Sequence, residues 1–175
     1  MPMFGGSKRP KLDGLTKDEE KRRDALNPEV LRRAGEGGVA GQGPAALAVL
    51  KERTEAEPGE FLWACLLGWQ LMSMHRFTGA IDAFAEATKR DASDVRGYYG
   101  AGAAHFEAAQ AKNDRGPATP ADVAPEGLTV DNLYHEALRY FRAALDQTTE
   151  KDERTTLTEA AAAAERAVAR KAGRL

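Results

Sequence analysis

The chain has 175 residues, of which 42% are hydrophobic and 30% are charged, and this composition is typical of a soluble globular domain with a core of its own. Its 25 Lys and Arg residues against 27 Asp and Glu residues give a net charge of −2, which argues against a general binder of nucleic acid. The single cysteine, Cys65, excludes an intramolecular disulfide framework and a metal site built from several thiolates of one chain.

The N-terminal residues 1–15 mix Gly, Pro and Lys without a hydrophobic period, which predicts a flexible arm. They lack the apolar core of a secretory signal, and the most apolar run, residues 61–74, is shorter than the roughly 20 residues that cross a bilayer as a helix. We therefore expect a cytoplasmic protein without membrane insertion. Basic clusters at 8–11 and 19–23 are candidates for nucleic-acid contact, but acidic residues interleave with the second cluster and favour a solvated charged helix.

Helix signals then follow one another along the chain. Thr16, with Glu19 three residues later, forms a capping-box pattern that starts a short helix within 16–26. Asn27 is the predicted cap of a second helix, and the glycine-rich stretch 35–44 is expected to end it. Apolar residues at helical spacing predict further helices at 45–55, 61–74, 77–89, 95–110, 133–148 and 155–172, and no strand pattern is present.

The connection 112–132 carries three prolines and two glycines in a chain otherwise built from helices. Such long connections are either functional or disordered. Two alternatives remain open from the sequence, a lid over a binding groove and a tolerated insertion, and the low thermodynamic cost of loop insertions favours the second.

Two segments repeat one pattern: AIDAFAEA at 80–87 and ALRYFRAA at 137–144. Gly68 and Gly102 lie 34 residues apart, and the second aromatic segment follows the first by 34 residues plus an insertion that the long connection supplies. Small residues at such positions let helices approach closely, and Phe84 and Phe141 are predicted to fill the space between neighbouring helical hairpins.

The 34-residue period, with Leu67 and Gly68 followed by Ala80, Phe84 and Ala87, resembles the tetratricopeptide repeat. The resemblance covers residues 27–150, as two recognisable repeats and one degenerate repeat. It implies an all-α, right-handed α-solenoid of about three helical hairpins with a C-terminal capping helix. We expect a flexible or partly helical N-terminal arm at 1–26 and a repeat domain at 27–175 with an insertion at 112–132.

The resemblance also implies a binding surface on the concave face, which the first helix of each pair forms. This face would carry a second apolar stripe opposite the packing stripe, and an apolar stripe has to be covered. The alternatives are the chain itself, through the 16–26 helix or the long connection, a second copy, or an apolar segment of another protein. The expected partner-binding residues are Leu62, Cys65, Trp69, Met72, Arg96, Tyr99 and Phe106.

These features predict a non-enzymatic interaction module or adaptor that binds an apolar peptide or helix of a partner protein. The alternative is a structural subunit whose concave face is covered by self-association. Catalysis is disfavoured, because the motifs are packing motifs and Cys65 sits in an apolar helix, as core or groove lining. We expect no cofactor, since no phosphate-binding glycine motif is present, and no metal, since His75, His105 and His135 stand on different helices or helix ends.

Overall fold

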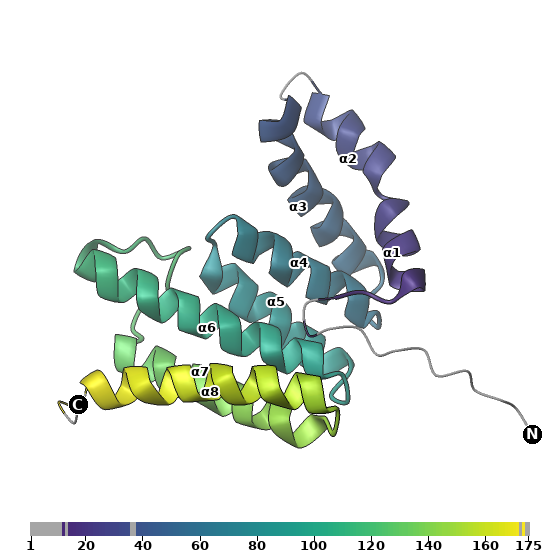
Figure 1. Cartoon of the computed structure of the whole chain (residues 1–175). Helices are drawn as coiled ribbons and strands as arrows, with labels where there is room; N and C mark the ends of the chain where they lie inside the picture. Colours follow the sequence, from purple (N-terminus) through teal and green to yellow (C-terminus); the bar gives the residue numbers. More distant parts are fainter. Residues whose placement is uncertain (1–11, 13, 36–37, 172, 174–175) are drawn as a thin grey trace, which may run out of the picture.

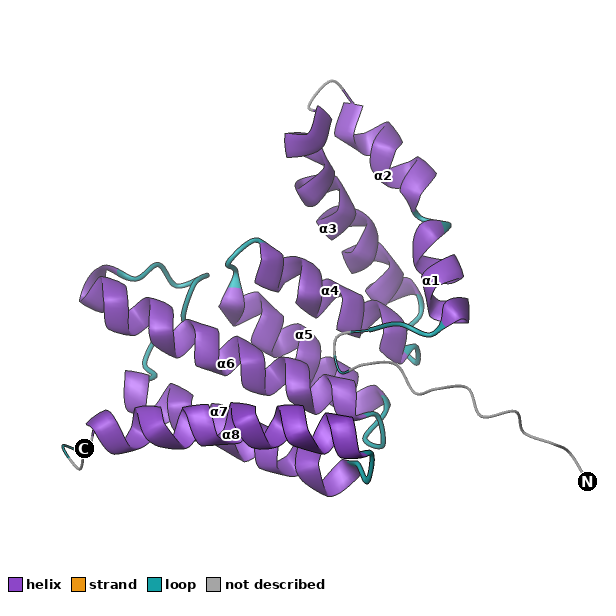
Figure 2. Cartoon of the chain, viewed as in Figure 1, coloured by secondary structure: helices purple, strands orange, loops and turns teal. Residues whose placement is uncertain are grey.

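The computed structural model describes residues 12, 14–35, 38–171 and 173. This part of the chain consists of helices, turns and loops without a strand, which confirms the all-α prediction (Figures 1 and 2). The predicted flexible arm and the basic cluster at 8–11 lie outside the described residues, apart from Leu12, Gly14 and Leu15. The helices are α1 Lys17–Asp24, α2 Asn27–Ala34, α3 Gly38–Ala56, α4 Phe61–Ser73, α5 Phe77–Arg90, α6 Val95–Arg115, the 3-10 helix η2 Gly116–Ala118, α7 Val130–Gln147 and α8 Lys151–Lys171.

Capping boxes set the start of two helices. At α1, the backbone N–H of Glu19 donates to the Thr16 hydroxyl (3.2 Å), and the backbone N–H of Thr16 donates to the Glu19 carboxylate (2.7 Å). This is the cap that the sequence predicts. Thr129 and Asn132 form the same reciprocal arrangement at the start of α7. Each box satisfies backbone N–H groups that have no partner inside the helix.

The α2–α3 region differs from the sequence prediction. Asn27 is the first residue of α2 and makes no cap, because the N-cap position is Leu26, which has no side-chain cap hydrogen bond. The glycine-rich stretch ends α2 at Gly35, where φ is 52°, but α3 already begins at Gly38 and keeps Pro44 inside the helix. A Cβ at Gly41 would lie only 2.9 Å from the backbone oxygen of Ala34. Tertiary packing therefore overrides weak helix propensity, and Gly41 serves the close approach of α2 and α3.

Consecutive helices pack on one another from α2 through α8, and α4 also contacts α6. Helices α4 to α8 lie side by side as a block, and α2 and α3 rise from its edge as a pair (Figure 1). In the described part of the chain, no helix is long and apolar enough to span a membrane.

Two aromatic rings lock neighbouring helices together. Phe84 on α5 is fully buried between two glycines, and a Cβ at Gly68 on α4 would lie 2.7 Å from its ring. Gly100 on α6 closes the other side of the same ring. Phe141 on α7 meets Gly102 in the equivalent way, again at 2.7 Å. The prediction that both rings wedge between helices is confirmed.

The connection 112–132 is anchored to α5. The first residues of the connection extend α6 to Arg115, beyond the predicted helix end at residue 110. The next residues form η2. The Thr78 hydroxyl then donates to the backbone oxygen of Ala121 (2.6 Å), and Val123 and Ala124 are buried in an apolar cluster. These contacts favour an accommodated insertion over a lid.

Candidate binding groove

Trp69 on α4 lies next to aromatic rings of two other helices. Its half-buried ring stands edge-on to Phe84, with centroids 4.9 Å apart, and 6.1 Å from Tyr99 on α6. Tyr99 in turn lies 6.1 Å from Phe141 on α7. A row of aromatic rings therefore crosses α4, α6 and α7, and such rings contribute large contact areas with few rotatable bonds.

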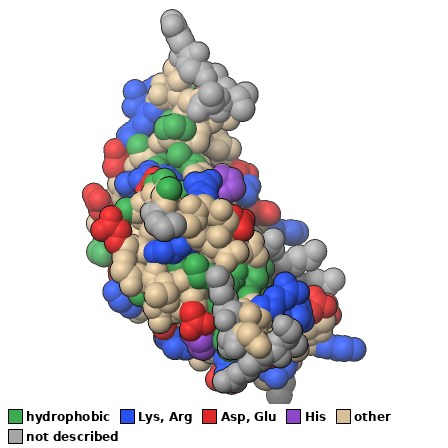
Figure 3. Space-filling view, turned by 90° about the vertical axis from the view of Figure 1, so that its left-hand side faces the viewer, with side chains coloured by type: hydrophobic (Ala, Val, Ile, Leu, Met, Phe, Trp, Pro, Cys, Tyr) green, Lys and Arg blue, Asp and Glu red, His purple; other side chains and the backbone are tan. Residues whose placement is uncertain are grey.

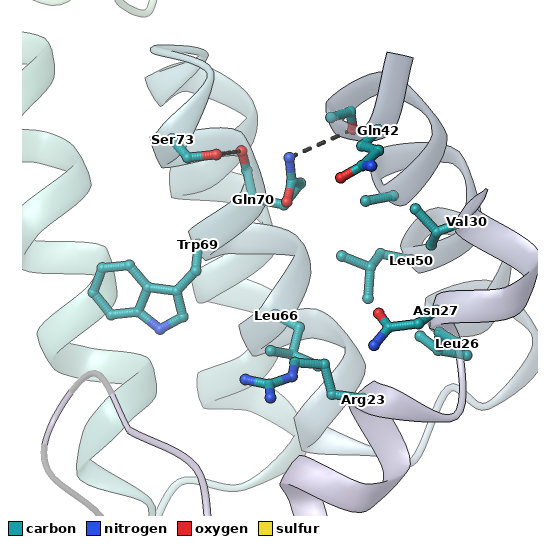
Figure 4. A pocket seen from close by; sticks show the side chains of 12 residues that line it. Arg23, Leu26, Asn27, Val30, Gln42, Leu50, Leu66, Trp69, Gln70 and Ser73 are labelled. Atoms are coloured by element: carbon teal, nitrogen blue, oxygen red, sulfur yellow. Dashed lines mark hydrogen bonds between the residues drawn. The ribbon is translucent and has the colours of Figure 1, made fainter. Parts of the chain in front are cut away.

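A groove of about 440 Å³ opens between the α2–α3 pair and α4. Figure 4 shows Leu66 and Gln70 of α4 facing Leu50 of α3 across the groove, whereas the Trp69 ring points away from α2 and α3. The floor is apolar, and polar groups sit around it. The lining residues are Arg23, Leu26, Asn27, Val30, Gln42, Gly43, Ala46, Leu50, Leu66, Trp69, Gln70 and Ser73.

Gln70 ties the two walls of the groove together. Its side-chain amide donates to the backbone oxygen of Gly43 across the groove, at 3.4 Å (Figure 4). A long hydrogen bond at a partly buried position contributes little stability, so this tie restrains the walls weakly. The groove thus combines an apolar floor with a few placed polar groups, the usual composition of a ligand site.

Leu31 stands beside this groove on α2. It follows Val30, which lines the groove, and is 57% exposed, the one large hydrophobic side chain exposed in the described residues. Arg32, on the same helix, forms an ion pair with Glu29, and Arg33 forms ion pairs with Glu29 and Glu52. Single exposed leucines are common, and this one is of interest because it directly follows a groove-lining residue of α2.

A second, smaller cavity of about 180 Å³ lies where α6, α7 and α8 meet. It takes Tyr99, Phe106 and Phe141 from the aromatic side, with Ala160 and Ala163 of α8 opposite. Its volume lies below the roughly 300 to 1,000 Å³ that is usual for ligand pockets, so the larger groove beside Trp69 is the better candidate for a binding site.

The residues expected to bind a partner divide into two groups. Trp69, Met72, Tyr99 and Phe106 are half-buried and keep some accessible surface. The others are buried in the chain itself: Leu62 is 3%, Cys65 1% and Arg96 6% exposed. Only the first group can touch a partner without a change in the structure, and Trp69 alone among them lines the larger groove.

Arg96 is buried because the N-terminal segment covers it. Its guanidinium donates to both carboxylate oxygens of Glu19, at 2.8 and 2.9 Å, and to Asp94 at 2.6 Å. Burial alone would lower the pKa of this guanidinium, but the hydrogen bonds from Arg96 to Asp94 and Glu19 outweigh burial and raise it. For Glu19, burial opposes ionisation, yet the hydrogen bonds from Arg96 and from the Thr16 backbone lower its pKa.

The remaining candidate groups do not converge on a reactive centre. Burial raises the pKa of Cys65 to about 12, which suppresses the thiolate that a nucleophile needs. His75 and His135 are exposed, whereas His105 is buried and stacks on Tyr140, with centroids 5.3 Å apart. Among the described residues, no three His, Cys, Asp or Glu side chains are grouped to hold a metal ion.

Charges of both signs are interspersed on the face shown in Figure 3, and hydrophobic side chains appear there in small patches. That mixture matches the near-neutral net charge of the chain.

Sequence reasoning missed the α2–α3 wall of the groove. The glycine-rich stretch 35–44 predicts a helix break, so the sequence does not indicate that Gln42 and Gly43 line a binding surface. The spacing of Leu26 and Val30, one helical turn apart, was the available signal for an apolar face on α2.

No family model matches the chain, and no curated protein matches its sequence.

Proposed function

We propose that the chain is a non-enzymatic protein-interaction module whose groove beside Trp69 binds an apolar peptide or helix of a partner protein. One observation carries the proposal, the apolar groove of about 440 Å³ between α2–α3 and α4, with the exposed Leu31 beside it. Aromatic and large aliphatic side chains in a partly desolvated groove are the usual anchors of such contacts.

We also propose that α4–α5 and α6–α7 are repeats resembling the tetratricopeptide repeat, that α2–α3 is a degenerate one, and that α8 is the capping helix. Two equivalent contacts support this interpretation. Gly68 meets Phe84 and Gly102 meets Phe141, at positions that correspond under the 34-residue period once the insertion is removed. A surface formed by stacked helix pairs suits an extended partner segment.

The experiment uses peptides of known sequence. A displayed library of helical and extended peptides is selected on the full chain, and the affinity of each selected peptide is measured by calorimetry. Leu31→Glu places a charge beside the groove, while Leu31 is exposed enough that the fold should tolerate it. We expect at least tenfold weaker binding, because the desolvated carboxylate costs about 1.4 kcal/mol or more.

Ala92→Glu is the matched control. It adds the same charge at an exposed position in the turn between α5 and α6, outside the groove. Its affinity should equal that of the wild type. Equal binding by Leu31→Glu, or a library that yields no peptide above background, contradicts the proposal.

Self-association is the alternative, and the exposed Leu31 is the observation that favours it. A structural subunit would use this side chain to join identical copies. Sedimentation velocity over a wide range of concentrations separates the two functions. A monomer at every concentration removes the structural subunit, whereas a dimer that Leu31→Glu dissociates supports it.

The cytoplasm remains our proposed location. The single cysteine of the sequence is a free thiol buried in the core. A reducing compartment suits such a chain, because it needs no disulfide for stability.

A further inference from the structure

The helix α1 differs from the other described helices in how it is held. It buries none of its own residues, and in the described part of the chain it does not pack along another helix. The attachments of its own residues are charged side chains, while the apolar residues Leu12, Leu15 and Leu26 pack into the core on either side of the helix. The guanidinium carbon of Arg22 lies 4.9 Å from the ring centroid of Trp63, and the same guanidinium pairs with Glu60 at 2.8 Å. Polar attachments of this kind leave a segment near the low-stability end of a protein.

The strongest attachment is a latch between α1 and α6. Glu19 accepts two hydrogen bonds from Arg96, and Arg96 also donates to the backbone oxygen of Gly14 at 3.3 Å. Glu19 simultaneously closes the capping box of α1 with Thr16. The start of the helix and its attachment to the body therefore depend on one carboxylate.

Beneath this latch lies part of the inner face of α4. Cys65 is 1% exposed, and the charges of Arg96, Asp94 and Glu19 all act on its thiol. Leu15, which precedes α1, packs on the same apolar cluster that buries Cys65. The N-terminal segment thus covers residues of α4 that would otherwise join the surface around Trp69.

We propose that residues 14–24 form a releasable strap, latched by Glu19 on Arg96, which opens as a unit while α4 to α8 stay folded. Opening frees Arg96, uncovers Cys65 and takes Arg23 away from the edge of the groove. The accessible inner face then grows from the half-buried Trp69 side toward the start of α6. The regulatory role of the strap rests on the proposed function, because the closed strap covers part of the proposed binding surface. The opening itself takes place without a partner.

Cys65 reports the opening, because it is the single cysteine of the chain. The full-length protein is treated with N-ethylmaleimide, a neutral reagent, and the rate of Cys65 modification is followed by mass spectrometry. Glu19→Gln is the test variant. It keeps the capping box, which accepts Glu or Gln at this position, and removes only the charge of the latch. We expect about tenfold faster modification, because the charged hydrogen bonds to Arg96 become neutral and weaker.

Glu20→Gln is the matched control. It makes the same charge change one residue further along α1, at an exposed carboxylate that forms no ion pair with the described part of the chain. Its modification rate should stay within about twofold of the wild type.

Urea denaturation of the wild type and both variants, followed by circular dichroism, gives the free energy of global unfolding of each protein. The strap is supported if Glu19→Gln accelerates modification by much more than it favours global unfolding. Equal rates for Glu19→Gln and Glu20→Gln overturn the proposal. So does a rate that rises only in proportion to global unfolding, because Cys65 is then exposed by loss of the whole fold. Neither readout uses a peptide, so failure of the strap and failure of the groove are distinguishable.

Discussion

Gly68 of α4 faces the ring of Phe84, and replacing it with alanine tests whether this ring is as confined as the packing implies. A Cβ at this position would lie 2.7 Å from the ring, whereas carbon atoms pack best at about 3.5 to 4.0 Å. The ring would have to retreat by about 0.8 Å. Gly100 lies against its other side, so the retreat leads into α6.

The expected cost follows from two opposing terms. Overpacking in a well-packed core costs about 1 to 3 kcal/mol, and confinement of the Phe84 ring on both sides places this case near the upper end. Alanine also gains about 1 kcal/mol over glycine inside a helix. The net loss of unfolding free energy is then about 2 kcal/mol, which lowers the Tm by roughly 4 to 8 °C for a chain of this size.

Urea denaturation followed by circular dichroism measures this loss, and Gly79→Ala is the control. Gly79 lies in the first turn of α5, where a Cβ would meet Leu71 at 3.4 Å, an ordinary contact. Gly79→Ala should therefore leave the stability unchanged or raise it by up to about 1 kcal/mol. Two identical substitutions are thus expected to differ in sign.

A Gly68→Ala protein as stable as the wild type would refute this reasoning. The double variant with Phe84→Leu gives a second check. The smaller side chain relieves the overlap, so the losses of the two single variants should add to more than the loss of the double variant. Strict additivity would mean that the ring and the new methyl group do not meet.

Three further predictions concern other contacts. Thr129→Ala removes the cap of α7 and should cost about 1 kcal/mol in urea denaturation. Arg90→Met should cost about 2 to 3 kcal/mol, because the largely buried Arg90 guanidinium donates to the backbone oxygens of Thr54, Glu57 and Glu60. The urea midpoint measures the loss. Burial lowers the pKa of His105 below 6.5, so the unfolded chain takes up the proton first. Stability present above pH 6.5 should therefore fall as the pH drops below that value, and His105→Gln should flatten this part of the profile of urea midpoint against pH.

Local chemistry determined much of the fold from the sequence alone. The capping box of Thr16 and Glu19 is confirmed, because both partners lie within one helical turn. The predicted burial of Phe84 and Phe141 is also confirmed, because both residues occupy the same position in a repeated sequence pattern of small and aromatic residues. The sequence prediction failed over residues 38–44, where glycines indicated a break and the structure has the first part of α3; the helix predicted at 45–55 is the rest of α3.

The candidate site was accessible to sequence reasoning only in part. Trp69 was identified from its helical face, and it lines the groove. Cys65 and Arg96 share that face, yet the structure buries Cys65 in the apolar core and Arg96 against Glu19 of the N-terminal segment. Helical periodicity tells which residues share a face but not what lies on it.

Sequence by itself thus determined the helical class, the aromatic and glycine pairs that join helices, and the absence of a disulfide framework. Only the tertiary structure decided that Glu19 closes on Arg96, 77 positions away, and that α3 forms a groove wall opposite α4. Caps and periodicity act within a few residues, whereas an ion pair between distant segments depends on where the whole chain brings them, and no local spacing encodes that distance.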